Sequence, residues 1–149
     1  MKVLSTRSVT FPIVSDIPIR LLDTNTLFTG YFDQKYAVRI MHNAKVSIFP
    51  SIYVEAFGMV IIEAMAAKVK PLSTRHSGFK ETLEAAAMSI PGMYINDFSV
   101  PLDEQVLINT VERTVSLLEE DREEIVDKMS KFALNNYGWT GITKQLLEL

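Results

Sequence analysis

Short strand-like segments alternate with helix-like segments through the middle of this chain, and this order limits its fold more than any other feature. Residues 46–49 and 69–73 are expected to form strands, and residues 58–67 and 79–87 are expected to form the helices that follow them. A further short strand is expected over residues 93–95. Strands joined through a helix pair in parallel, because the helix returns the chain to the same end of the sheet. The sequence therefore predicts an α/β fold with a parallel sheet.

Weaker signals flank this core. We expect strands over residues 9–14 and 27–31, a helix over residues 34–43 capped by Asp33, and a final helix over residues 139–149. Two amphipathic helices are expected after residues 101–103. Their buried faces are predicted to hold Leu107, Val111, Val115 and Leu118 in the first helix, and Ile125, Met129, Phe132 and Ala133 in the second.

Composition excludes several classes of protein. A chain of 149 residues with 48% hydrophobic residues has the size and composition of one globular domain. It contains no cysteine, which excludes a disulfide framework, a thiolate zinc site and a cysteine nucleophile. Its only histidines are His42 and His76, which leave little for a histidine-built metal centre. We expect no bound metal and no cofactor.

The sequence carries no signal-peptide pattern and no apolar run long enough to cross a membrane. A cytoplasmic location is therefore expected, and peripheral contact with a membrane stays open.

The formal net charge of −3 argues against general binding of nucleic acid. Residues 1–80 contain ten Lys and Arg against five Asp and Glu, whereas residues 81–149 contain five against thirteen. The basic half suits an anionic ligand, and the acidic half is expected to be solvated helix surface.

One helix carries an unusual charge. Residues 59–67 are apolar except for Glu63, so we expect this helix to be buried against the sheet. A lone carboxylate there must either pair with a cation such as Arg75 or Lys80, or accept hydrogen bonds from the hydroxyl groups of a ligand. Glu55 lies in the preceding loop, and Gly58 at the helix start allows close approach of a phosphate. The segment therefore suits a ligand that bears both hydroxyl and phosphate groups.

Other residues near predicted strand ends have weaker claims. His76 is either a phosphate contact or an ordinary surface histidine, and Arg75 either faces phosphate or pairs with Glu63 or Glu81. The rings of Tyr53 and Phe57 are as well suited to core packing as to stacking on a base. Trp139 is expected to pack against the core.

The segment PSIYVEAFGMVIIEAMAA, residues 50–67, resembles the signature of GT-B glycosyltransferases of the family-4 type, also described as glycosyl transferases group 1. Glu55 and Glu63 occupy the two carboxylate positions of that signature. The resemblance covers residues 26–149, and residues 1–25 are not assigned. It extends over residues 28–31 (FTGY), 44–51 (AKVSIFPS), 71–74 (PLST), 77–81 (SGFKE) and 136–139 (NYGW).

The resemblance implies a single Rossmann-like, three-layer domain, the C-terminal half of a GT-B fold without its first βα segment. It implies that Glu63 holds the ribose of a nucleotide sugar, and that Glu55 contacts the donor sugar as a catalytic residue. The backbone of Phe57, Gly58 and Met59 would follow the sugar and diphosphate. The Ser77-Gly78 loop would complete the substrate site, and transfer would be retaining and independent of metal.

This reading makes the chain the donor-binding part of a glycosyltransferase that is inactive alone. Its acceptor-binding N-terminal domain would lie elsewhere in the protein or in a partner subunit. The alternative is a non-catalytic nucleotide-sugar-binding or regulatory module, which is favoured by two departures from the family pattern. First, Lys68 stands where the family has a glycine, so its backbone is either strained or differently turned. Second, the family's basic residues that bind the diphosphate belong to a segment that precedes the region of resemblance.

Overall fold

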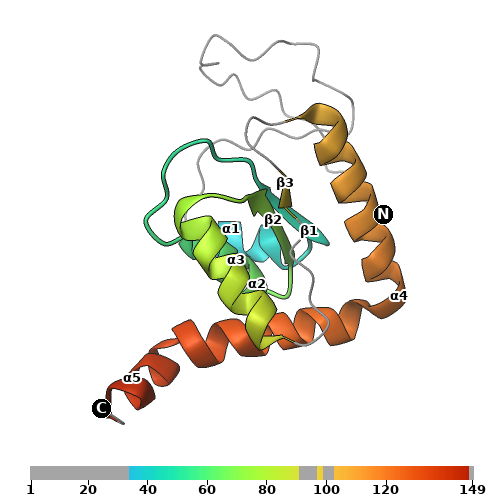
Figure 1. The fold of residues 1–149 in the computed structure, drawn as a ribbon. Helices are drawn as coiled ribbons and strands as arrows, with labels where there is room; N and C mark the ends of the chain where they lie inside the picture. Colours follow the sequence, from blue (N-terminus) through green and yellow to red (C-terminus); the bar gives the residue numbers. More distant parts are fainter. Residues whose placement is uncertain (1–33, 91–96, 99–102, 148–149) are drawn as a thin grey trace. The chain divides into compact units, whose positions relative to one another are not determined.

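The computed structural model describes residues 34–90, 97–98 and 103–147, which form an α/β structure (Figure 1). Contacts divide the chain at Gln34, and the fold below is that of the second unit, Lys35–Leu149. The predicted strands over residues 9–14, 27–31 and 93–95, and the predicted cap Asp33, lie outside the described residues.

Within the described residues the sheet has three parallel strands, in the order β1-β2-β3. They are β1 (Val46–Phe49), β2 (Lys70–Thr74) and β3 (Asp97–Phe98). Val46 pairs with Lys70, and Ser73 pairs with Asp97. The parallel α/β prediction is therefore confirmed, with β1 as predicted and β2 one residue later than predicted.

Five helices accompany the sheet in the described part of the chain: α1 (Gln34–Met41), α2 (Met59–Ala66), α3 (Ser77–Ser89), α4 (Glu104–Tyr137) and α5 (Trp139–Leu147). The Asp103 side chain caps α4 by accepting a hydrogen bond from the backbone N–H of Val106 at 2.9 Å. The two amphipathic helices predicted after Asp103 form one element. Asp121 interrupts its helical geometry with φ −135° and ψ 38°, so α4 bends at the point where two helices were expected to meet.

The main core lies where α2 and α3 meet the second half of α4. Ile61, Ile62 and Met65 supply the face of α2, and burial of each contributes roughly 1.5–3 kcal/mol. The rest of the buried cluster comes from α3, the residue after it and α4: Phe79, Leu83, Ala86, Ile90, Leu118, Val126, Met129, Phe132 and Ala133. A smaller cluster of Ala64, Ala67 and Val69 packs against Met41, Ala44 and Phe49. The inward residues predicted for the second half of α4 are thereby confirmed, except that Ile125 is only partly buried.

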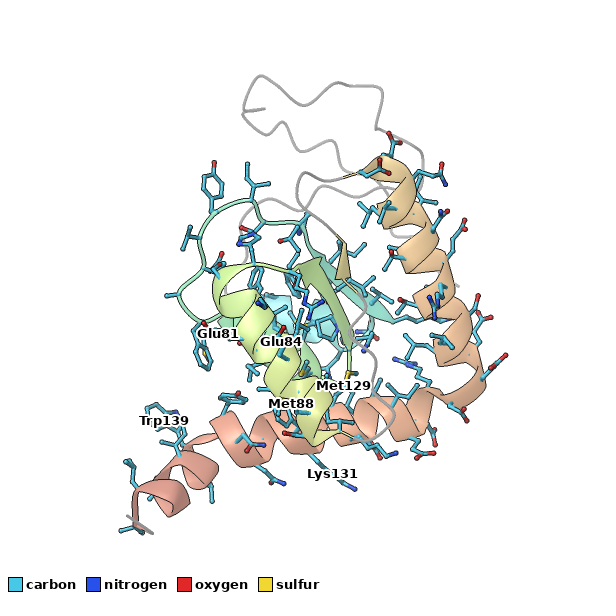
Figure 2. All side chains as sticks on the ribbon, in the orientation of Figure 1. Glu81, Glu84, Met88, Met129, Lys131 and Trp139 are labelled. Atoms are coloured by element: carbon cyan, nitrogen blue, oxygen red, sulfur yellow. The ribbon has the colours of Figure 1, made fainter. Side chains whose placement is uncertain are left out.

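Two burial predictions are wrong. Met59 and Val60, at the start of α2, are 51% and 38% exposed, so this helix is not buried all round. Trp139 begins α5 and is 85% exposed, with its ring directed away from the neighbouring helices (Figure 2). An apolar residue in a helix is recognised from the sequence, but whether the rest of the fold covers it is not.

Among the described residues, every helix is too short or too polar to cross a membrane.

Candidate functional site

The carboxyl ends of β1 and β2 lie at one edge of the sheet, and the loops that leave them carry most of the predicted site residues. β1 ends at Phe49 and leads through residues 50–58 into α2. β2 ends at Thr74 and leads through Arg75 and His76 into α3. Parallel sheets bind their ligands at this edge, because each strand delivers a loop and a helix N-terminus there.

Hydrogen bonds join the two loops. The backbone N–H of Glu55 donates to Ser77 Oγ at 2.9 Å, and the backbone N–H of Gly78 donates to the Glu55 carbonyl at 2.8 Å. One turn into α3, Thr82 Oγ1 donates to the carbonyl of Phe57 at 2.6 Å. The structure thus brings together Glu55, Phe57, Ser77 and Gly78, which sequence analysis placed in one site from two separate segments.

Two glycines allow these loops to meet. A Cβ on Gly78 would lie 2.5 Å from the backbone nitrogen of Phe57, closer than real Cβ contacts. Gly58 caps α2 with φ +80°, a left-handed conformation, and a Cβ there would lie 2.5 Å from Phe79 Cδ1. The left-handed turn at Gly58 thus allows close packing against α3, and the close approach to a ligand that was expected of it stays a prediction.

Ser77 also holds a left-handed backbone, with φ 45°. A non-glycine residue in this region costs about 1–2 kcal/mol. The Ser77 side chain offsets part of this cost, because its hydroxyl accepts the hydrogen bond from Glu55 and lies 3.0 Å from His76 Nδ1. Strained backbone of this kind gathers at functional sites.

Glu63 lies on the second turn of α2 and is partly buried. The ion pair between Glu63 and Arg75 that sequence analysis weighed is not present among the described residues; Arg75 Nη2 bonds Glu84 Oε1 on α3 at 2.8 Å. Neither Glu63 nor Glu81 is therefore the partner seen for Arg75. Within the part of the chain that the structure describes, the Glu63 carboxylate has no hydrogen bond or ion pair. It remains free to accept hydrogen bonds from a ligand.

Both ring nitrogens of His76 contact protein atoms. Nε2 lies 2.8 Å from the carbonyl oxygen of Ser51, and Nδ1 lies 3.0 Å from Ser77 Oγ. The phosphate contact expected of His76 and Arg75 stays a prediction, but the ring nitrogens of His76 already have partners within hydrogen-bonding distance.

The polar residues that join the two loops were not predicted from the sequence. Thr74 Oγ1 donates to the Ser51 carbonyl at 2.5 Å, and Thr82 bonds Phe57. The available signal was the position of Ser51 and Thr74 just beyond or at the ends of strands. Tyr53 does not pack in the core, being 76% exposed, whereas the ring of Phe57 meets that of Tyr137 edge-on at 5.5 Å between centroids.

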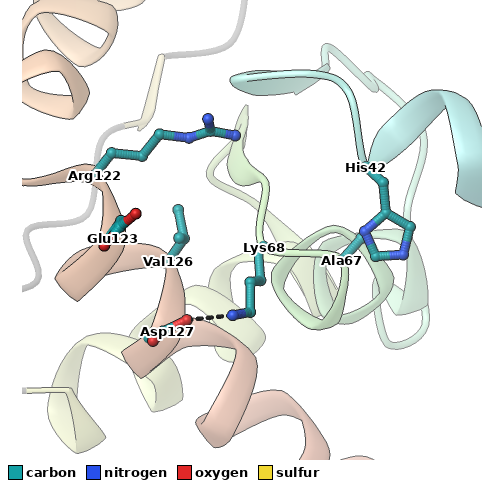
Figure 3. Close-up of a pocket in the computed structure, with 7 residues that line it drawn as sticks. All are labelled: His42, Ala67, Lys68, Arg122, Glu123, Val126 and Asp127. Carbon is teal, nitrogen blue, oxygen red and sulfur yellow. Dashed lines mark hydrogen bonds and ion pairs between the residues drawn. The ribbon is translucent and has the colours of Figure 1, made fainter.

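A separate hollow of about 430 Å³ opens beside the C-terminus of α2 (Figure 3). It lies by the residues that lead into the strands, away from the carboxyl edge. Lys68 and Asp127 form an ion pair in it, and this contact lowers the pKa of the Asp127 carboxyl. The remaining lining residues are His42, Ala67, Arg122, Glu123 and Val126. No predicted site residue lines it, and no group of three or more His, Asp or Glu suited to a metal ion occurs in the described ranges.

Comparison with known proteins gives two findings. Residues 17–133 match the family described as glycosyl transferases group 1. The chain is also 28% identical over 127 residues to lipopolysaccharide 1,2-N-acetylglucosaminetransferase of Salmonella typhimurium (strain LT2). That alignment covers 85% of this chain and 31% of the relative, so the chain spans about a third of the relative's length.

Proposed function

This chain belongs to the glycosyl transferases group 1 family, and from that premise we propose that it is the donor-binding domain of a retaining glycosyltransferase. The domain would be the C-terminal half of a GT-B enzyme of the family-4 type. It would bind a nucleoside-diphosphate sugar at the carboxyl edge of the sheet, and the sugar would pass to an acceptor held by another domain. The proposal includes no metal and no cofactor, and for this it rests on the family resemblance.

The observation that carries the proposal is the Glu63 carboxylate. It stands on an otherwise apolar helix, partly buried and without a partner among the described residues. A carboxylate has two oxygens, and each can accept a hydrogen bond from one hydroxyl of a ribose diol. A bound nucleotide would give this charge the hydrogen bonds that the described residues do not.

The other residues of the site have assigned roles in this proposal. Glu55 contacts the donor sugar as the catalytic residue, and the backbone of Phe57, Gly58 and Met59 follows the sugar and diphosphate. Ser77 and Gly78, at the N-terminus of α3, lie toward the diphosphate together with Arg75. The phosphate contact expected of His76 is not carried into this proposal, because both of its ring nitrogens have protein partners. Backbone N–H groups at a helix start stabilise negative charge, so they suit a leaving diphosphate.

The relative suggests the first donor to test. Its name specifies transfer of N-acetylglucosamine in lipopolysaccharide, and we extend to this chain only the proposal that an N-acetylhexosamine donor is used. UDP-N-acetylglucosamine is therefore the first probe, followed by UDP-, GDP- and ADP-linked hexoses.

Isothermal titration calorimetry of the full chain tests the proposal. We expect one of these donors to bind, and Glu63→Gln to weaken its affinity about tenfold to a hundredfold, because hydrogen bonds to a charged acceptor are lost. The matched control is Glu120→Gln, which removes an exposed carboxylate from α4 and should leave affinity unchanged. If no nucleotide sugar binds to the folded chain, or if Glu63→Gln binds as the unaltered chain does, the proposal is wrong.

A further inference from the structure

The loop that carries Glu55 gains little stability from apolar burial. Its side chains Ile52, Tyr53 and Val54 are between 64% and 87% exposed. A loop without buried apolar side chains keeps its conformation mainly through hydrogen bonds of its backbone. The position of Glu55 therefore depends on the groups that bond residues 51–57.

Two of these groups come from adjacent residues after β2. His76 contacts the beginning of the loop, through Nε2 and the Ser51 carbonyl at 2.8 Å. Ser77 contacts a later part of the loop, because its hydroxyl oxygen accepts a hydrogen bond from the backbone N–H of Glu55 at 2.9 Å. The 3.0 Å contact between His76 Nδ1 and Ser77 Oγ connects the two side chains to each other.

The chemistry of the end groups fixes the direction of the two outer bonds in this series. A carbonyl can only accept, so His76 Nε2 carries the hydrogen that reaches Ser51. In a neutral ring Nδ1 is then an acceptor and takes the hydroxyl hydrogen of Ser77, whose oxygen in turn accepts the Glu55 N–H. Each donor thus has one acceptor, and the series runs from Glu55 through Ser77 and His76 to Ser51.

We propose that His76 is a positioning residue for Glu55: through Ser77 and the Ser51 carbonyl it holds the loop so that the Glu55 carboxylate faces the donor sugar. This inference rests on the proposed function and adds to it a residue that need not touch the substrate. It also accounts for Ser77 at a left-handed position, where glycine would be less strained but would lack the hydroxyl group.

Packing offers a competing explanation. The His76 ring lies 6.3 Å from that of Phe79, centroid to centroid, so it also fills space at the start of α3. His76→Phe keeps an aromatic ring and removes both nitrogens, whereas His76→Gln keeps an N–H that can reach the Ser51 carbonyl. Comparing these two variants separates the effect of ring packing from the effect of hydrogen bonding.

Binding of two ligands supplies the first readout. In the proposed site Glu55 contacts the sugar, and Glu63 contacts the ribose from a different element. We expect His76→Phe to weaken binding of UDP-N-acetylglucosamine about fivefold to tenfold, as for loss of one or two hydrogen bonds, and to leave binding of UDP unchanged. His76→Gln should restore most of the lost affinity. Equal weakening for both ligands, or no weakening, would overturn the inference.

Hydrogen exchange of the unliganded chain supplies a second readout that needs no ligand. His76→Phe should speed exchange of the Glu55 amide about tenfold relative to amides in the core of α4, since that amide donates to Ser77. Unchanged exchange at Glu55 overturns the inference even if nucleotide sugars bind. If exchange changes as expected but no nucleotide sugar binds to the unaltered chain, the loop contact stands and the proposed function fails.

Discussion

Lys70 is a buried charge at the beginning of a central strand. It starts β2, pairs with Val46 in the sheet and is only 5% exposed. Burial lowers the pKa of its ammonium group from 10.5 to about 8, since the charged form loses its solvation. At neutral pH the folded chain therefore keeps a charge in an unfavourable environment.

The stability of the fold should consequently rise with pH through this group. Below pH 8 both folded and unfolded chains hold the proton; between pH 8 and 10.5 the folded chain releases it first, which stabilises the fold by up to about 3 kcal/mol. We expect Lys70→Met to be more stable than the unaltered chain at pH 7, and this advantage to shrink toward pH 10.5. Urea denaturation at several pH values measures it. Lys80→Met, which removes an exposed lysine, is the control and should show no such trend.

Helix α2 ends in a glycine-type turn that contains no glycine. The N–H of Val69 donates to the Ala64 carbonyl at 2.9 Å, and the N–H of Lys68 donates to the Met65 carbonyl at 3.0 Å. These are the two hydrogen bonds of a Schellman motif, which requires a left-handed residue at Lys68, where φ is 61°. The turn therefore has the usual Schellman geometry. The departure of Lys68 from the family pattern appears as strain in the backbone of that residue.

Replacing Lys68 should separate this strain from its ion pair with Asp127. Lys68→Gly and Lys68→Ala both remove the ion pair, but only glycine adopts a left-handed backbone without strain. We expect the glycine variant to be about 1 kcal/mol more stable than the alanine variant in thermal or urea denaturation. An alanine variant of equal or greater stability would show that the backbone at this position is not strained.

Local sequence patterns predicted the elements that carry the site better than their surroundings. β1, α2 and the start of α3 match because the turn residues Pro50, Gly58 and Ser77 occur where these elements begin or end. The strand β3 is not predictable locally, since its two residues, Asp97 and Phe98, pair only because β2 lies beside them. The hydrogen bonds of Thr74 and Thr82 likewise depend on which loops the fold brings together.

At the scale of the whole molecule, the chain corresponds to about a third of the Salmonella relative that it resembles. Under the proposed function it holds the donor, and the groups that bind the acceptor come from another domain. The alternative of a non-catalytic module makes the same prediction for donor binding. The two differ only when an acceptor domain is supplied.

Reconstitution distinguishes them. We expect the chain alone to bind a donor without transferring its sugar, and transfer to appear when the N-terminal part of the Salmonella relative is added with its acceptor. Transfer of a radiolabelled sugar from the donor to the acceptor would measure the product. Glu55→Gln should abolish transfer while UDP binding persists, because that residue is assigned to the sugar. Donor binding without transfer in the reconstituted mixture would favour the non-catalytic module.

The exposed ring of Trp139 determines how this protein can be observed by fluorescence. It is the only tryptophan in the sequence and is already 85% exposed on α5 in the folded chain. Its emission maximum should lie near that of indole in water and should shift little when the core around Met129 and Phe79 melts. Intrinsic fluorescence is thus a poor monitor of unfolding here, but a sensitive one for any molecule that covers α5.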